Sequence, residues 1–395
     1  MIKIVGIGPG NIDDMTERAK YTIESADCII GGDRQLENFS DLSSEKISLS
    51  VGFREVVDEI EKRCDTQEIA VLVSGDPCYY SFFRYLKRNL SCKLEVVPAL
   101  NSIQYFFSKL GKTYEDAVFL SVHGRSCDYI DALRDYKTVA LLTDYEQSPQ
   151  AIAKKLKSFN MKVKMYVGYR LSYEDEKIIE GMPSELENIK HKAMAVVILE
   201  SLEDYNRECH IPDIDFLRNS TPMTKEEIRY ITLGKLELKS NHHLVDIGSG
   251  TGSISIEASR FLYKGKVTSI EVKSEAVDIM KENIKKHRCE NIDLIHGDAV
   301  DALKKIEYCD RVFIGGTRGN FQEIMSLLES KISSNGIVVM NAVTLETLSE
   351  WTEYMKCSEK KYELIQVQIS RSSRLGKYQM LDGGRPIFIM KIWWN

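Results

Sequence analysis

Short apolar runs alternate with amphipathic stretches along most of the chain. In the first half, runs with the composition of β-strands cover 2–7, 69–74, 117–122, 138–143 and 193–199. Between them, apolar residues recur at helical spacing in stretches such as 54–64 and 150–159. Strands that alternate with helices are typical of α/β proteins with mainly parallel sheets, and this fold class is predicted here.

The segment 200–221 interrupts this alternation. It is polar, carries Pro212 and contains no long apolar run. Such a composition is typical of a linker between domains. The sequence therefore predicts a domain over 1–205 and a second domain over 211–395.

The alternation restarts after the linker. The pattern predicts helices over 225–236, 253–261 and 274–287, and strands over 243–247, 266–271, 292–296, 311–314, 336–341, 364–369 and 386–392. A second α/β domain is expected from this order.

Composition narrows the class of protein. Of 395 residues, 43% are hydrophobic and 28% are charged, which is ordinary for a globular protein and unlike a disordered chain. No apolar run approaches the length of about 18 residues that a membrane-spanning helix needs. The start, Met1–Gly6, has the pattern of a strand entering a glycine turn rather than of a signal peptide. We therefore expect a cytoplasmic protein with no membrane partner.

The cysteines and charges exclude further classes. The nine cysteines are scattered and form no CxxC pair, so we expect neither a disulfide framework nor a metal site. Up to residue 210 the chain has 27 basic and 34 acidic residues, and the remainder has 26 and 25. Neither part has the basic excess of a nucleic-acid binder. The segment 371–391 is a local exception, with five basic residues and one acid.

The clearest chemical signal follows the predicted strand 243–247. Gly248, Gly250 and Gly252 form a GxGxG loop that opens a helix, and glycines allow the backbone to pass close to a ligand. A dinucleotide loop has GxGxxG spacing instead, so this loop suits a ligand without a phosphate. Glu271 ends the next strand, where a carboxylate can accept ribose hydroxyls, and Asp298 follows the third strand, where a side chain can meet an adenine ring.

This order of a glycine loop, an acid and an Asp at successive strand ends resembles the Rossmann-like S-adenosylmethionine-dependent methyltransferases. Further blocks, namely 211–216, 223–229, 312–316, 341–348 and 368–371, resemble the decarboxylating precorrin methyltransferases that act at carbon 15. The resemblance covers about 211–395. It implies that S-adenosylmethionine is bound by Thr224, Asp246, Gly248, Ser249, Gly250, Thr251, Gly252, Glu271, Asp298 and Ala299.

The first half carries different loops at its strand ends. Gly6-Ile7-Gly8-Pro9-Gly10 ends the first strand, and Gly75-Asp76-Pro77 ends another. Each loop alone is weak evidence, since ordinary turns have the same composition. Together with the blocks 121–125, 141–149 and 168–173, they resemble the tetrapyrrole methylase family over about 1–205.

That family has a fold of two small α/β lobes with S-adenosylmethionine bound between them. The resemblance implies that Gly8, Pro9, Gly75, Asp76, Pro77 and Ser102 bind this cofactor. The chain departs from the family pattern at Pro98-Ala99-Leu100-Asn101-Ser102, where Pro-Gly-x-Ser-Ser is usual.

Several residues are candidates for contact with the substrate. His123-Gly124-Arg125 points to the branch of the family that methylates carbon 5, with His123 a candidate catalytic residue or a substrate-orienting one. Arg125 could bind a substrate carboxylate or make a structural ion pair. Arg371, Arg374 and Lys377 are predicted to lie in a loop after a strand, where they would either bind carboxylates or form a solvated surface.

Taken together, the resemblance implies a fused enzyme for corrin-ring biosynthesis. Its N-terminal domain would methylate carbon 5 of a tetrapyrrole, and its C-terminal domain would methylate carbon 15 and remove the acetate carboxylate of ring C. We expect a homo-oligomer with no nucleic-acid partner. Two alternatives remain open at this stage: a methyltransferase that acts on rRNA or protein, and a cofactor-binding sensor without turnover.

Overall fold

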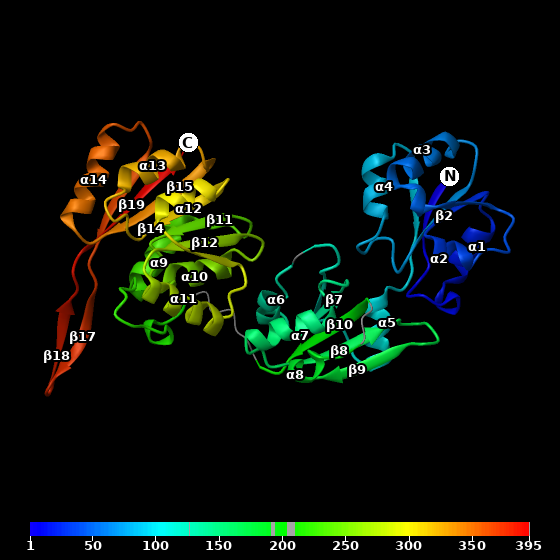
Figure 1. Ribbon diagram of the computed structural model, residues 1–395, viewed down its shortest axis with the longest axis horizontal. Helices are drawn as coiled ribbons and strands as arrows, with labels where there is room; N and C mark the ends of the chain where they lie inside the picture. The colour runs from blue at the N-terminus through cyan, green and yellow to red at the C-terminus, as the bar shows by residue number, and fades with distance from the viewer. Residues whose placement is uncertain (126, 191–193, 204–209, 395) are drawn as a thin grey trace. The chain divides into compact units, whose positions relative to one another are not determined.

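The structure is a computed structural model that describes residues 1–125, 127–190, 194–203 and 210–394. Contacts within the chain divide it into two compact units, 1–205 and 206–395. Each unit is described below by itself (Figure 1).

The N-terminal unit begins with a five-stranded sheet in the order β3-β2-β4-β1-β5, in which every pair is parallel. Its strands are β1 (Ile2–Gly6), β2 (Cys28–Gly31), β3 (Glu45–Ser48), β4 (Ile69–Val73) and β5 (Leu94–Val97). Its helices are α1 (Glu17–Glu24), α2 (Asp33–Glu37), α3 (Phe53–Arg63) and α4 (Phe83–Asn89), with short 3-10 turns at Ile12–Asp14 and Leu49–Val51. Separate apolar clusters cover the two faces of β1 and β4, which explains the unbroken apolar sequence of β4 and the largely apolar sequence of β1.

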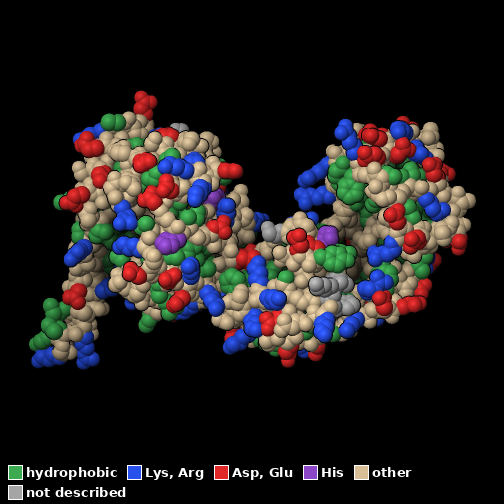
Figure 2. All heavy atoms as spheres, viewed as in Figure 1, with side chains coloured by type: hydrophobic (Ala, Val, Ile, Leu, Met, Phe, Trp, Pro, Cys, Tyr) green, Lys and Arg blue, Asp and Glu red, His purple; other side chains and the backbone are tan. Residues whose placement is uncertain are grey.

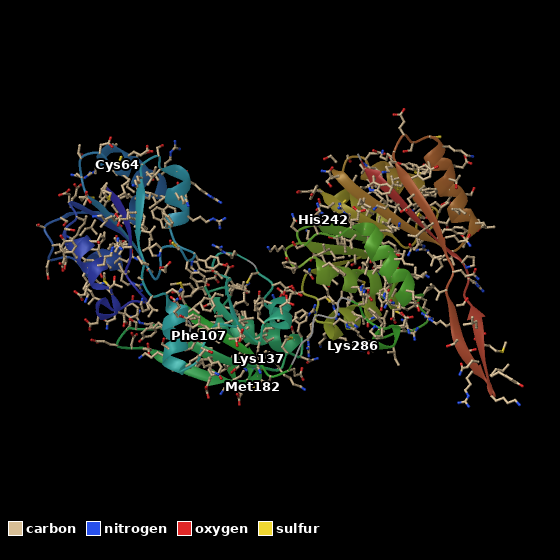
Figure 3. The ribbon with its side chains drawn as sticks, turned by 180° about the vertical axis from the view of Figure 1, so that it is seen from behind. Cys64, Phe107, Lys137, Met182, His242 and Lys286 are labelled. Carbon is tan, nitrogen blue, oxygen red and sulfur yellow. The ribbon has the colours of Figure 1, made fainter. Side chains whose placement is uncertain are left out.

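The second sheet of this unit has the order β6-β7-β10-β8-β9. Its strands are β6 (Ala117–Ser121), β7 (Thr138–Leu142), β8 (Val163–Tyr169), β9 (Lys177–Gly181) and β10 (Ala195–Ser201). Its helices are α5 (Ser102–Leu110), α6 (Tyr129–Asp135), α7 (Pro149–Ser158) and α8 (Pro183–Leu186). Only β6 and β7 pair in parallel, so the prediction of mainly parallel sheets is wrong for this sheet. Phe107 of α5 is fully buried in the apolar cluster between this helix and the sheet (Figure 3).

The C-terminal unit contains a seven-stranded sheet in the order β13-β12-β11-β14-β15-β19-β16. Its strands are β11 (His243–Ile247), β12 (Lys266–Glu271), β13 (Ile292–His296), β14 (Cys309–Ile314), β15 (Ile332–Ala342), β16 (Tyr362–Val367) and β19 (Ile387–Trp394). The first five are parallel, and β19 runs antiparallel to β15 and β16. One face is covered by α9 (Glu226–Leu236), α10 (Ser253–Phe261) and α11 (Ser274–Lys286), and the other by α12 (Ala299–Lys305), α13 (Phe321–Leu328) and α14 (Leu345–Lys356).

The central strand β11 sends alternate side chains to the two faces. Val245 and Ile247 pack on the α12–α14 side, whereas Leu244 packs on the α9–α11 side. Asp246 is fully buried and accepts a hydrogen bond from Ser255 of α10. Burial and, to a smaller extent, the charge of Glu271 together raise the pKa of Asp246 to about 7, against the opposing effect of the hydrogen bonds from Ser255.

The predicted loop around Arg371 is wrong. Strands β17 (Ser370–Leu375) and β18 (Tyr378–Gly383) form a two-stranded hairpin that leaves the sheet between β16 and β19 (Figure 1). Both strands are exposed, so no buried face imposes the alternation by which a strand is recognised in sequence. Apolar and basic side chains gather on this hairpin (Figure 2).

The predicted linker is wider than the break between the units. Strand β10 extends to Ser201, and the segment after residue 210 packs on the C-terminal unit, where Ile211 and Phe216 are buried. The fully buried Arg229 of α9 holds this segment. Its guanidinium bonds Asp213 at 2.5 Å, Glu257 at 2.8 Å, the Thr224 carbonyl at 2.7 Å and the Ile211 carbonyl. Residues 211–224, part of which was predicted to be linker, are therefore an ordered segment packed on the C-terminal unit, called the strap below.

Arg229→Met is expected to destabilise the C-terminal unit by about 3–5 kcal/mol, because the buried carboxylate of Glu257 loses the guanidinium with which it forms an ion pair. The chain's three tryptophans, Trp351, Trp393 and Trp394, all lie in this unit, so urea unfolding followed by tryptophan fluorescence reports on it alone. Lys281→Met removes an exposed pair with Asp278 and should change stability by less than about 0.5 kcal/mol. Equal effects of the two substitutions would contradict the role given to Arg229.

Asp246→Asn is expected to change how stability depends on pH. The pKa of an unfolded Asp is about 3.9, so between about pH 4 and pH 7 only the folded chain keeps the proton. The stabilisation from the protonated group is full below about pH 4 and is lost as the pH rises through about 7. Asparagine stays neutral, so the variant should gain stability relative to the wild type between pH 5 and pH 8. Asp293→Asn on the exposed face of β13 is the control, and an identical stability difference at both pH values would refute the prediction.

Candidate functional site

The glycine loop of the C-terminal unit connects β11 to α10. Gly248, Gly250 and Gly252 have φ angles of 72°, 56° and 81°, which other residues rarely adopt. The loop is tied to neighbouring strands, since the Gly248 N–H donates to the Ile270 carbonyl at 2.9 Å and the Gly315 N–H donates to the Ile247 carbonyl at 2.8 Å. The loop therefore has a fixed path at the carboxyl edge of the sheet.

Glu271, at the end of β12, is held against this loop. One carboxylate oxygen accepts the Gly250 N–H at 2.9 Å, and the other accepts the N–H groups of Val272 and Lys273, also at 2.9 Å. The side chain is 7% exposed. It can therefore face a ligand in only one orientation, with lone pairs left for hydroxyl donors.

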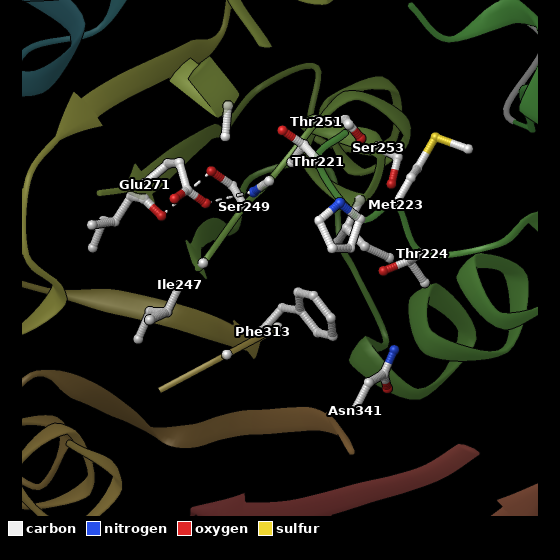
Figure 4. A pocket seen from close by; sticks show the side chains of 18 of the residues that line it. Thr221, Met223, Thr224, Ile247, Ser249, Thr251, Ser253, Glu271, Phe313 and Asn341 are labelled. Atoms are coloured by element: carbon white, nitrogen blue, oxygen red, sulfur yellow. Dashed lines mark hydrogen bonds between the residues drawn. The ribbon is translucent and has the colours of Figure 1, made fainter. Parts of the chain in front are cut away.

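A cavity of about 350 Å³ opens above the loop. Figure 4 shows Glu271 and Ser249 on one side of it, Met223 and Thr224 on the other, and Phe313 between them. Much of its wall is apolar. The predicted cofactor residues that line it are Thr224, Gly248, Ser249, Gly250, Thr251, Glu271, Asp298 and Ala299.

Two predicted cofactor residues lie outside the lining of this cavity. Asp246 is buried behind the loop, and Gly252 is the N-cap residue of α10. Asp298 caps α12, where its side chain accepts the Val300 N–H at 2.8 Å. The binding roles of all these residues remain predictions.

Sequence reasoning missed several lining residues. The strap contributes Thr221, Pro222 and Met223, the end of β14 contributes 315–318, and Asn341 and Ile387 come from β15 and β19. Gly315 and Gly316 follow the buried parallel strand β14, and Asn341 lies at the carboxyl end of β15. The carboxyl ends of parallel strands share one edge, and this signal could have identified all three residues. Ile387 belongs to an antiparallel strand and gave no such signal.

The loops of the N-terminal unit also come together at a sheet edge. The Gly75 N–H donates to the Gly8 carbonyl at 2.8 Å. A Cβ added to Gly6 would lie 2.7 Å from the Ala99 Cβ and 2.8 Å from the Pro77 Cδ, so only glycine fits there. The predicted residues Gly75, Asp76 and Pro77 therefore lie beside the segment that departs from the family pattern, and Gly8 is joined to Gly75.

The segment 98–102, which departs from the family pattern, is held by hydrogen bonds that its backbone and its side chains make. Asp76 accepts the Cys78 N–H at 2.8 Å and the Ala99 N–H at 3.3 Å. Asn101 caps α5 by accepting the Gln104 N–H at 2.9 Å, so an asparagine does the work of a capping serine, and Ser102 begins the helix.

His123 and Arg125 follow β6 and are exposed. The His123 Nδ1 lies 3.3 Å from the Thr143 carbonyl, and the Arg125 guanidinium lies 4.7 Å from the centre of the Tyr80 ring, which follows β4. Hydrogen bonds from the Gly124 and Gln147 backbones lower the pKa of Asp144 beside them. Arg125 thus stacks on an aromatic ring, and its role as a carboxylate ligand remains a prediction.

The basic residues of the C-terminal segment separate into groups. Arg371 lies at the base of the hairpin and pairs with Glu227 of α9, with an Nε–Oε1 distance of 3.1 Å and a second contact. Arg374 and Lys377 lie near the hairpin turn. Lys391 is buried and pairs with Glu237, so it does not belong to a basic surface.

Among the described residues, no three His, Cys, Asp or Glu side chains are grouped so that they could hold a metal ion. No helix in the described part of the chain is long and apolar enough to cross a membrane.

Comparisons with known proteins match both units. Residues 1–187 match the tetrapyrrole (corrin/porphyrin) methylases, and residues 215–393 match the precorrin methyltransferase domain. A probable cobalt-precorrin-6B C(15)-methyltransferase (decarboxylating) of Sulfurisphaera tokodaii is 37% identical over 183 residues, which cover 46% of this chain and 95% of that protein.

Two further matches carry a related name. A precorrin-6Y C(5,15)-methyltransferase (decarboxylating) of a Sinorhizobium species is 26% identical over 401 residues, covering 99% of this chain and 95% of that protein. A crystal structure of a precorrin-6Y C5,15-methyltransferase from Geobacter metallireducens is 33% identical, with a TM-score of 0.45, and covers 46% of this chain and 97% of that one. The chain therefore belongs to the family of decarboxylating precorrin methyltransferases, with a tetrapyrrole methylase domain joined to its N-terminal side.

Proposed function

We propose that the chain is a bifunctional methyltransferase of cobalamin biosynthesis. The N-terminal unit methylates carbon 5 of a precorrin or cobalt-precorrin, and the C-terminal unit methylates carbon 15 and removes the ring C acetate carboxylate. The observation that carries the proposal is the cavity above the glycine loop, with Glu271 fixed toward it, in a chain that also holds a tetrapyrrole methylase domain.

The residues present fit S-adenosylmethionine. Its adenosyl part offers ribose hydroxyls to Glu271 and an adenine ring to Asp298 and Ala299, and it has no phosphate for which the loop would need a cradle. When bound, this cofactor supplies a methyl group on a positively charged sulfur. The cavity wall between Phe313, Ile254 and Val343 is apolar and excludes water from such a group.

The protein's part in the reaction is binding and alignment. The meso carbons of a reduced tetrapyrrole have enamine character and are nucleophilic, so no side chain has to act as a strong nucleophile. The fixed loop and strap hold the reacting groups in line. When the ring C acetate loses its carboxyl as CO₂, the conjugated imine of the macrocycle accepts the electron pair, so a second cofactor is not required.

Two other functions compete with this proposal. A methyltransferase of rRNA would need a broad basic surface, which the charge balance of the sequence does not provide. A sensor would bind the cofactor without turnover, and transfer of labelled methyl groups to a tetrapyrrole separates it from an enzyme. We further propose a cytoplasmic homo-oligomer.

The two sites are expected to bind cofactor and act independently. Glu271→Ala should weaken cofactor binding in the C-terminal unit by about 5- to 150-fold, because the ribose hydroxyls lose the carboxylate that would accept their hydrogen bonds. Asp76→Ala should weaken binding in the N-terminal unit alone. Calorimetry should find two sites in the wild type and one strong site in each variant.

Mass spectrometry of the products tests the assignment of reactions. The wild type should add two methyl groups and remove one carboxyl. Under limiting cofactor, the Glu271→Ala product should keep its carboxyl, and the Asp76→Ala product should lose it with a single methyl gained. One cofactor per wild-type chain, or label transfer to neither carbon, would refute the proposal.

We propose that Arg371, Arg374 and Lys377 bind carboxylates of the substrate. Arg371→Ala should weaken tetrapyrrole binding by about 1.5–3 kcal/mol if a charge-assisted hydrogen bond is lost. Arg374→Ala should have a smaller effect, because this residue lies nearer the hairpin turn. The measurement is carbon 15 methylation at varied substrate, with carbon 5 methylation as the internal control. If both variants keep the KM and turnover of the wild type, the basic residues of the hairpin form a solvated surface and do not bind the substrate.

A further inference from the structure

A second cavity, of about 360 Å³, lies at the base of the hairpin in the C-terminal unit. It adjoins the cavity above the glycine loop. The residues that line both are Lys225, Ile228, Val343 and Ile387. A ligand that fills the first cavity and is wider than it can therefore extend into the second across a largely apolar wall.

The second cavity combines this wall with charged groups at its rim. The cations are Lys225, Arg371 and Arg385, and the acids are Glu227 and Asp382. An apolar surface edged by guanidinium groups matches a flat macrocycle that carries acetate and propionate side chains.

Two of the three cations already have partners. Arg371 is bound by Glu227, and Lys225 lies 3.5 Å from Asp213. Burial works to raise the pKa of Glu227, but the bonds from its own backbone N–H and from Arg371 outweigh burial and hold that pKa below its usual value. Glu227 therefore stays charged and occupies one edge of the Arg371 guanidinium, through Nε and Nη2. Arg385 has no ion pair or hydrogen bond with any residue that the structure describes.

The backbone presents Arg385 at a fixed corner. The Gly384 N–H donates to the Ile369 carbonyl at 2.8 Å, and the Gly384 carbonyl accepts a bond from Gln368 at 3.2 Å. A Cβ on Gly384 would lie 2.9 Å from the Ile369 oxygen, so glycine permits this close crossing. Pro386 follows and restricts Arg385 to extended backbone. The free guanidinium thus starts from an ordered position.

We propose that Arg385 and the second cavity form a seat for one peripheral carboxylate of the tetrapyrrole, one that the reaction does not remove. This inference rests on the proposed function. The macrocycle lies across the shared wall of Ile228, Val343 and Ile387, with its reacting edge in the first cavity. The ion pair at Arg385 then selects which edge of the ring faces the methyl donor, so Arg385 determines where the ring is methylated.

The test uses the full-length chain and cobyrinic acid, a stable corrinoid whose side-chain carboxylates are free. Arg385→Ala should weaken its binding by about 10- to 100-fold, and Arg385→Lys should restore part of it, because a lysine keeps the charge without the bidentate geometry. Arg218→Ala, an exposed arginine that lines neither cavity, is the matched control. Binding of the same corrinoid with its side chains amidated should be unaffected by Arg385→Ala, as should cofactor binding.

A kinetic measurement completes the test. Arg385→Ala should raise the KM for the tetrapyrrole in carbon 15 methylation and leave carbon 5 methylation unchanged. The role given to Arg385 is refuted if Arg385→Ala binds cobyrinic acid with wild-type affinity, or if it loses equal affinity for the free and the amidated corrinoid. Methylation by the wild type would still support the proposed function in that case. If the wild type binds neither corrinoid and methylates no precorrin, both proposals fall.

Discussion

Parallel pairing of β11 with β12 and β14 is the constraint on which the C-terminal site depends. Parallel strands need a crossover between them, and all their carboxyl ends then meet at one edge of the sheet. The register places Ile247 beside Ile270 and Ile314, so the residues that follow these strands are neighbours. Backbone bonds from Gly248 and Gly315 lock this edge. Glu271 can therefore reach the loop at Gly250, far away along the sequence.

Buried charge holds the remaining wall of the cavity in place. The strap 211–224 buries Ile211 and Phe216, and Arg229 attaches it to α9 and α10 through four polar partners. Thr224 lines the cavity because its carbonyl is one of those partners. A charge taken out of water is costly unless it is paired and hydrogen-bonded. The Arg229 guanidinium uses four of its five donors on groups of the strap and of α10.

The base of the hairpin extends the site beyond the cavity above the glycine loop. The hairpin leaves the sheet beside Ile387, and its base supplies a second cavity whose wall continues that of the first. Glu227 occupies one edge of the Arg371 guanidinium, whereas Arg385 lies at a corner fixed by Gly384 and has no ion pair with a described residue. The cavity above the glycine loop can therefore hold the reacting groups, and the adjoining cavity at the base of the hairpin can hold the outer part of a larger ligand.

The sequence by itself determined the α/β class, the order of most strands and helices, and the contributions of the glycine loop, Glu271 and Asp298 to one edge. Each of these follows from a local pattern: buried strands are apolar, and the loop needs glycines at positive φ. Tertiary structure alone decided that Asp246 faces Ser255 behind the loop, that Lys391 is buried against Glu237, and that 371–377 belongs to a hairpin. It also decided that the second sheet is largely antiparallel and that Arg385 lies beside Ile387 in a cavity. These features depend on which distant segments pair as strands and on which charged side chains form ion pairs. Neither kind of contact produces a periodic pattern in the local sequence.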